Sequence, residues 1–388
     1  MLLRKITICA IMLLAWQSQA DGIAPKVFYG GIAYLGSYEF IEQNYQHARR
    51  LNRSQEGHIG QLDGFFKTAL DRQPPTQFKL EFGLANLYES ESVVMAVAID
   101  KELVSLEKYH INNEVRQKLI VEASAQLLFF DYESKNLIAN YPQALAINHL
   151  LPVTGIDLDK EIEKLFNTLY LGAEQSVGFL QRIADTAQSA SVAQLRGFRF
   201  QLRQFNLENQ VEAQLPGALS AGQFRQYFGQ FFSAQLAQQY PVPVLPFIKG
   251  YALGNQLPGR FANGQVFNLQ FPEPDFVFDI TVKKFAKGKD KSGLIYGAQL
   301  SFDFLENDGE RVLANDDFRY GVYKIDSGSE SEVDDWSAYE DALENLIIEL
   351  VQQLNKPNRN WLSEHARNGS ASYKNFNAKK ELFDEYLR

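Results

Sequence analysis

Short runs of apolar and aromatic residues alternate along this chain with longer apolar stripes at helical spacing. Residues 26–35, 93–99 and 198–205 have the composition of strands, and residues 276–282 alternate apolar with polar positions. A chain that mixes such strands with amphipathic helices predicts helices packed on a sheet. The expected fold class is therefore α+β.

Two predicted β-hairpins resemble each other. The first covers residues 125–140 and the second residues 298–315, and each has two short apolar strands around a polar turn. Asp308-Gly309 is a good tight-turn pair, whereas the turn of the first hairpin has no glycine. The similarity in order and in several short strings predicts an internal duplication.

Helix patterns flank both hairpins in the same way. Residues 65–70 and 231–236 share an aromatic pattern, and prolines that stop a helix follow each of them. Amphipathic stripes at residues 158–169 and 336–354 follow the hairpins. Each half reads as β–α–β–β–β–β–α, so two duplicated domains are expected, each a mixed β-sheet with a hairpin and packed amphipathic helices. The predicted division is a signal peptide at 1–20, a first α+β domain at 21–170, a helical linker at 171–195, a second α+β domain at 196–356 and a C-terminal tail at 357–388.

The first twenty residues have the pattern of a cleavable signal peptide. Arg4 and Lys5 precede an apolar run at residues 6–16, and small residues end the segment. The run is too short to cross a bilayer as a helix, and no later stretch approaches that length, so no integral membrane segment is expected after cleavage. The expected location is the periplasm, with the cell exterior or the outer membrane surface as alternatives.

The only cysteine, Cys9, lies inside this segment. The exported chain would then lack disulfides, thiolate metal sites and cysteine nucleophiles. The formal net charge of −9 disfavours nucleic acid, which clustered lysines and arginines bind.

No residue pattern for catalysis is present in the sequence. The five histidines do not form a helical zinc pair, and the chain has no nucleophile elbow, Walker loop or dinucleotide fingerprint. The sequence thus predicts no catalytic, cofactor-binding or metal-binding residue. A carboxylate pair for glycoside hydrolysis stays open, because such residues converge only in the folded chain.

One basic cluster and the tail are the candidate contact surfaces. Lys283, Lys284, Lys287 and Lys289 are expected in a hairpin loop, which is either simply solvated or contacts an acidic partner or an anionic glycan. The acidic residues 326–335 read as a solvated loop, with calcium as the alternative.

The tail contains Trp361, and its final stretch carries Phe383 and Tyr386 among charged residues. It is either a helix that docks back on the domain or a recognition element for another envelope protein.

The second half resembles a known family of bacterial envelope domains. A strand at residues 275–282 is followed by the lysine-rich loop, a strand at 294–304, the turn Asp308-Gly309-Glu310, a short strand and the long closing helix. This order resembles the domain shared by the TolB N-terminal module, the curli-secretion protein CsgG, the penicillin-binding-protein activator LpoB and the middle domain of the flagellar protein FlgT. Asp303 and the turn match the family pattern, while Ile280 stands where the family has glycine.

The resemblance implies a function class rather than a site, because its motifs are structural. Proteins of this kind bind other proteins, assemble into rings or act as adaptors. We therefore expect a periplasmic, non-catalytic binding or assembly component of a Gram-negative envelope machine, with envelope proteins or further copies of the chain as partners. The alternatives are a periplasmic protein that binds a small molecule or glycan and, less favoured, a hydrolase of envelope polymers.

Overall fold

The computed structural model gives the fold of most of the chain. It describes residues 25–36, 38–53, 60–83, 93–111, 114–173, 176–190, 198–216, 219–240, 242–247, 256–289, 293–308, 311–324 and 335–386. The predicted signal peptide at 1–20, the turn residues Gly309 and Glu310 and nearly all of the acidic loop at 326–335 lie outside the described residues.

The first sheet has seven strands in the order β5-β4-β3-β1-β8-β9, with β2 also paired to β1. β1 runs parallel to β2 and β3, and its neighbour β8 is antiparallel to it. β3, β4 and β5 form an antiparallel meander. The strands are β1 (Lys26–Leu35), β2 (Lys79–Phe82), β3 (Val93–Ile111), β4 (Glu114–Asp131), β5 (Leu137–Pro152), β8 (Gln256–Phe261) and β9 (Val266–Gln270).

The second sheet has five strands in the order β12-β11-β10-β6-β7. β6 runs parallel to β7 and β10, and β10, β11 and β12 form an antiparallel meander. Five strands of the first sheet have this same arrangement around β1. The strands are β6 (Phe200–Leu207), β7 (Val244–Leu245), β10 (Phe276–Lys289), β11 (Leu294–Glu306) and β12 (Val312–Lys324).

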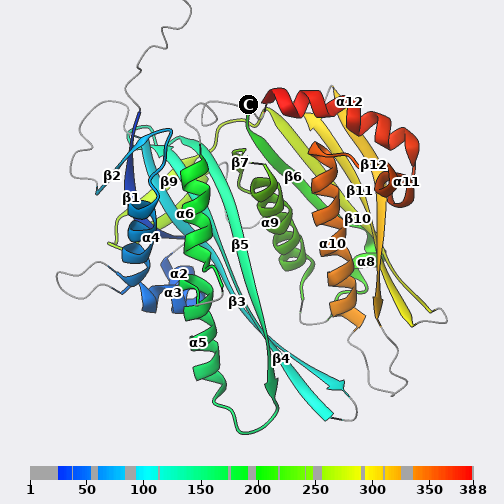
Figure 1. Ribbon diagram of the computed structural model, residues 1–388, viewed down its shortest axis with the longest axis horizontal. Helices are drawn as coiled ribbons and strands as arrows, with labels where there is room; N and C mark the ends of the chain where they lie inside the picture. The colour runs from blue at the N-terminus through cyan, green and yellow to red at the C-terminus, as the bar shows by residue number, and fades with distance from the viewer. Residues whose placement is uncertain are drawn as a thin grey trace, which may run out of the picture.

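Helices and sheets alternate in layers (Figure 1). α4, α5 and α6 cover one face of the first sheet, and α9 contacts both β5 of the first sheet and β6 of the second. α10 packs on β11 and β12 beside α9. These helices are α4 (Gln61–Arg72), α5 (Leu158–Leu171), α6 (Phe179–Ser189), α9 (Ala221–Gln239) and α10 (Asp335–Asn355). Shorter or terminal helices are α2 (Tyr38–Asn44), α3 (Gln46–Leu51), α8 (Asn209–Glu212), α11 (Arg359–His365) and α12 (Ser370–Tyr386).

Local sequence signals start two of the long helices where the apolar stripes begin. The Asp157 side chain accepts a hydrogen bond from the backbone N–H of Lys160 at the start of α5 (3.3 Å). Ser220 and Gln223 form a reciprocal capping box at the start of α9. Both arrangements satisfy backbone N–H groups that a helix start leaves unpaired.

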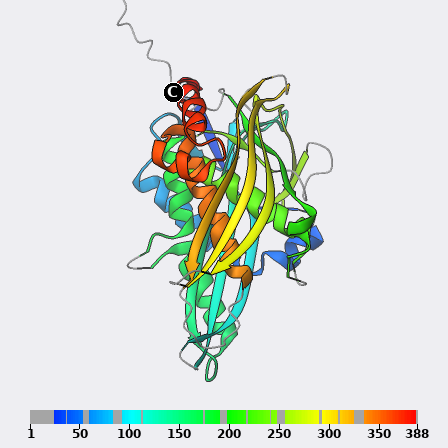
Figure 2. The same ribbon diagram turned by 90° about the vertical axis from the view of Figure 1, so that its right-hand side faces the viewer.

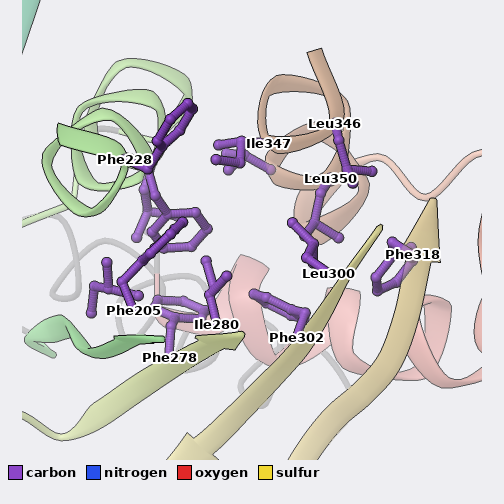
Figure 3. Close-up of a cluster of buried hydrophobic side chains, with 14 of the residues drawn as sticks. Phe205, Phe228, Phe278, Ile280, Leu300, Phe302, Phe318, Leu346, Ile347 and Leu350 are labelled. Carbon is purple, nitrogen blue, oxygen red and sulfur yellow. The ribbon is translucent and has the colours of Figure 1, made fainter. Parts of the chain in front are cut away.

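Aromatic residues dominate the core of the second half. Phe278 and Phe302 lie beneath Phe228 of α9 and Leu346 and Leu350 of α10 (Figure 3). These side chains are fully buried. Burial of large rings and leucines between one sheet face and two helices supplies the main stabilising free energy of such a layer.

The predicted α+β fold is confirmed, and both predicted hairpins and both closing helices are present. Three segments lie differently from their prediction. The lysine-rich segment is the end of strand β10 and not a loop. Within the expected linker, α6 is buried in the first core through Phe179, Leu180 and Ile183. The β8–β9 hairpin, from the second half of the sequence, extends the first sheet.

Candidate functional site

The predicted basic cluster is divided between the two faces of β10. Lys283 binds Asp317 on the outer face (Nζ to Oδ1, 2.8 Å), and Ser301 donates to the same oxygen (2.9 Å). Lys287 binds both oxygens of Asp335 (2.7 and 2.9 Å) at the start of α10. Lys284 and Lys289 have exposed side chains. The structure therefore does not bring the four lysines together, and two of them form ion pairs within the chain.

These ion pairs also affect the acids. Partial burial would raise the pKa of Asp317, but hydrogen bonds from Lys283 and Ser301 outweigh it and lower that pKa. The pKa of Asp335 is lowered in the same way by Lys287 and Tyr296, against the effect of burial. Both carboxylates are thus held ionised, and both already have hydrogen-bond partners within the chain.

The tail is docked on the second half. Trp361 stacks on Phe318 of β12 (ring centroids 6.0 Å apart), and Phe376 of α12 is buried beside Phe302 and Phe318. Asp316 accepts hydrogen bonds from Asn368 and Ser372. Of the two alternatives for the tail, the structure therefore shows docking, while the side chains of Phe383 and Tyr386 lie outside the described residues.

A carboxylate pair of the kind that the hydrolase alternative needs lies on the outer face of the second sheet. Asp279 and Asp303 are directly opposite each other, and Arg203 binds both oxygens of Asp279. Burial and the nearby Asp279 raise the pKa of Asp303. No described helix stands in front of this face in Figure 2, so the pair lies on an open strand surface and does not favour hydrolysis.

A polar seam joins the two halves. Lys101 of β3 binds Glu122 of β4 (2.9 Å) and lies over the ring of Tyr227 of α9 (4.1 Å from the centroid). The Tyr227 hydroxyl donates to Glu344 of α10 (2.6 Å). Burial is the main cause that raises the pKa of both Tyr227 and Glu344. The seam links α9 and α10 to the first sheet. It lies at the base of an arm that three strands of this sheet form.

The distal parts of β3, β4 and β5 form this arm. β1 pairs with β3 only from Val93 to Ile99, and a β-bulge follows at Asp100. Beyond it, β3 pairs with β4 on one side, and none of the described strands pairs with its other edge. Figure 1 shows the ends of β3 and β4 projecting past the second sheet.

Apolar side chains are exposed along this open edge. Leu103, Val104 and Leu106 of β3 have exposed fractions of 40%, 40% and 39%. Proteins ordinarily protect an unpaired edge with lysine, proline, a bulge or a covering element. Four consecutive residues with three exposed apolar side chains therefore mark this edge as a candidate contact surface. We call residues 101–111 of β3 the open edge.

Glu102 anchors the base of the open edge. Its carboxylate accepts hydrogen bonds from the backbone N–H groups of His47 (3.1 Å) and Ala48 (2.7 Å) in α3 and from the Tyr170 hydroxyl of α5 (2.9 Å). Burial raises the pKa of Glu102 to about 7, although these hydrogen bonds act to lower it. The anchor holds α3 and α5 next to the point where β3 leaves β1.

This raised pKa predicts a pH dependence of stability. The folded chain holds the Glu102 proton more tightly than the unfolded chain, whose pKa is near 4.5. The stabilising contribution is therefore fully present below about pH 4.5 and is lost as pH rises through about 7, at up to ~1.4 kcal/mol for each pH unit in this window. In urea unfolding between pH 4.5 and 8, we expect Glu102→Gln to remove this decline, so that the difference between the two proteins isolates Glu102. If the wild type instead gained stability over the variant with rising pH, the hydrogen bonds to the ionised carboxylate would dominate.

The sequence pattern permits a strand along the open edge but does not reveal the edge. No glycine or proline interrupts residues 100–111, but residues 102–106 do not alternate strictly, because Leu103 and Val104 are both apolar. The continuous apolar run of residues 93–99 stops at Ile99, directly before the β-bulge at Asp100.

The described residues hold neither a membrane-spanning helix nor a clustered metal site. No described helix is both long and apolar enough to cross a membrane. No three histidine, cysteine, aspartate or glutamate side chains gather as a metal site within the described ranges. No family model matches the chain, and no curated protein matches its sequence.

Solved structures with a detectable likeness include three bacterial proteins. A minor lipoprotein from Acinetobacter baumannii has 9% identity over 43% of this chain and 92% of its own, with a TM-score of 0.23. The hypothetical protein CT253 from Chlamydia trachomatis has 9% identity over 40% and 95%, with a TM-score of 0.26. A homolog of a neuraminyllactose-binding hemagglutinin from Helicobacter pylori has 13% identity over 46% and 91%, with a TM-score of 0.27. These likenesses have TM-scores of 0.27 or less, so they assign neither a family nor a function to the chain.

Proposed function

We propose that this chain is an exported, non-catalytic binding component of a bacterial envelope assembly, and that it holds a partner protein along the open edge of β3. The observation that carries the proposal is the row of exposed apolar side chains on an unpaired strand edge. Such an edge offers both backbone hydrogen bonds and side-chain contacts to an added strand. The partner would contribute an extended segment with apolar residues at alternate positions.

The geometry of β3 determines which side chains that segment would contact. Val104 and Leu106 lie on the face of the sheet that α5 covers, because their β4 partners Val121 and Leu119 are buried in the first core. Leu103 lies on the opposite face. An added strand would cover all three side chains and would gain about 25 cal/mol for each Å² of apolar surface that it removes from water.

The proposal also includes export of the chain and an internal duplication. The basic and apolar pattern of residues 1–20 supports cleavage and a periplasmic location. The shared strand arrangement of the two sheets supports an internal duplication with a first unit at 21–170 and a second at 196–356. The β8–β9 hairpin would then be an insertion of the second unit that completes the sheet of the first.

In-cell crosslinking tests the proposal. The tagged full-length chain, expressed in a Gram-negative host, is crosslinked in intact cells, purified from the periplasmic fraction and analysed by mass spectrometry. We expect one defined envelope protein to be enriched over an exported control protein. Recovery of the chain alone, or its retention in the cytoplasm, would contradict the proposal.

A further inference from the structure

The second sheet contains an edge that matches the open edge in position. β10 pairs with β6 only as far as Val282, just as β3 pairs with β1 only as far as Ile99. A β-bulge follows in each strand, at Asp100 in β3 and at Lys283 in β10. Beyond its bulge, β10 pairs with β11 on one side, and none of the described strands pairs with its other side. We call residues 284–289 of β10 the matching edge.

A short helix holds the base of each edge. In the first half, the carboxylate of Glu102 accepts hydrogen bonds from two backbone N–H groups of α3. In the second half, the Gln210 side chain of α8 donates to the backbone carbonyl of Lys283 (2.7 Å), and the backbone N–H of Glu208 donates to the carbonyl of Val282 (3.0 Å). The two edges thus begin at equivalent places, and their side chains can be compared position by position.

This comparison matches two apolar residues with two lysines. Counted from the bulge, Val104 stands where β10 has Lys287, and Leu106 stands where β10 has Lys289. Lys287 lies on the face of the second sheet that α10 covers, because it binds Asp335 at the start of that helix. Val104 lies on the face of the first sheet that α5 covers. Since strand residues two apart share a face, all four side chains lie on the helix-covered faces of their sheets.

The matching edge has the properties that keep a strand from adding to a sheet. Within residues 284–289, all of which the structure describes, Phe285 is buried and the exposed side chains are three lysines and an alanine. An added strand would have to desolvate the charge of Lys287, whose side chain is 40% exposed and binds both oxygens of Asp335. Lysines and inward-pointing charges on an edge strand are devices by which proteins block strand addition. Gly288 adds to the effect, because it offers no side chain for an added strand to contact.

We propose that Lys287 and Lys289 close the matching edge to strand addition and so confine the partner segment to the open edge of β3. The choice between two edges of equivalent position then depends on two pairs of side chains, which are apolar at positions 104 and 106 and cationic at 287 and 289. Confinement of the partner rests on the proposed function, whereas closure of the matching edge does not need a partner. The lysines of β10 are thus specificity-determining residues and not a basic contact surface.

An exchange of the two pairs tests the proposal. The opened-edge variant carries Lys287→Val and Lys289→Leu. The exchange variant carries Val104→Lys and Leu106→Lys in addition, so its net charge equals that of the wild type. A photoreactive amino acid replaces either Leu103 or Ala286, which stand at the same distance from their bulges, and the tagged full-length chains are irradiated in living cells.

The crosslinked products should follow the apolar pair. In the wild type, we expect a product with the envelope partner from position 103 and at least ~10-fold less from position 286. The opened-edge variant should give this product from both positions, and the exchange variant from position 286 only. The matched control removes two exposed lysines from helical segments, by Lys356→Val after α10 and Lys374→Leu in α12, and should behave as the wild type.

Self-association provides a second measurement that needs no partner. Sedimentation velocity is recorded for each purified chain over a range of concentrations. The opened-edge variant should associate at a ~10-fold lower concentration than the wild type, because its matching edge can then add a strand from another copy, and the control variant should not. Urea unfolding with an unchanged midpoint checks that each variant keeps its fold.

The two measurements separate this proposal from the proposed function. If position 103 of the wild type gives a product, then the proposal is overturned when position 286 of the opened-edge variant gives none. If position 103 gives no product, the partner assignment fails, and the proposal is overturned when the opened-edge variant associates no more strongly than the control variant. A product from position 286 of the wild type would also overturn it, because the matching edge would then be open with both lysines present.

Discussion

Replacing Val104 and Leu106 together by lysine is expected to abolish capture of the envelope partner while leaving the fold intact. Both side chains are about 40% exposed on the open edge, and their loss removes apolar contact surface for an added strand. Lysine on an unpaired edge also opposes strand addition, because the added strand would have to desolvate its charge. In the crosslinking experiment we expect the partner signal to fall ~10-fold or more, as a loss of ~1.4 kcal/mol or more in binding requires.

The matched control makes the same chemical change elsewhere on exposed strands. Val266 of β9 and Val312 of β12 are 70% and 50% exposed and lie away from the arm. The pair Val266→Lys and Val312→Lys should leave partner capture unchanged. Each double variant should unfold within ~1 kcal/mol of the wild type, because surface substitutions are usually small in effect. Equal loss of capture in both double variants would mean that added charge, and not the open edge, is responsible.

Phe376→Ala is expected to lower the free energy of unfolding by ~3–5 kcal/mol, the usual cost of removing a buried aromatic ring. Phe376 of α12 is only 2% exposed and packs against the rings of Phe302 and Phe318. Urea unfolding followed by tryptophan fluorescence measures the change. Phe198→Ala is the control, because Phe198 is 39% exposed and its removal should cost much less. Equal costs for the two variants would show that the tail does not complete the core.

This prediction changes how the tail can be studied. Truncation after Pro357 removes α11 and α12, and with them Trp361, Leu362 and Phe376 from the core of the second half. A loss of partner binding after such a truncation would report unfolding as readily as a lost contact. Point variants on the open edge do not have this problem, because their side chains contribute little to either core.

The local parts of the fold could be predicted from the sequence. α5 and α10 follow from apolar residues at helical spacing, and the hairpins follow from apolar runs around polar turns. Strand lengths could not be predicted where a bulge interrupts the alternation. Register shifts at Ile99/Lys101 in β3 and at Val282/Lys284 in β10 hide the continuation of both strands, so the sequence pattern does not reveal the open edge and wrongly predicts a loop for the lysines.

Pairing between distant segments could not be predicted from the sequence either. β8 adds to β1 through the pair Ala33 and Phe261, a contact that no local pattern specifies. Likewise, the lysine cluster looks like one basic patch in the sequence. Strict alternation would put Lys283 and Lys287, four residues apart, on the same face, but the β-bulge between Val282 and Lys284 puts them on opposite faces, where they bind different acids.

Site-specific photocrosslinking tests most directly whether the open edge holds the partner. A photoreactive amino acid replaces Leu103 on the open edge in one variant and Thr281 on the open face of the second sheet in another, and both are irradiated in living cells. We expect a defined crosslinked product with an envelope protein from position 103 and none from position 281. A product from position 281 alone would contradict this assignment and would move the contact surface to the second sheet.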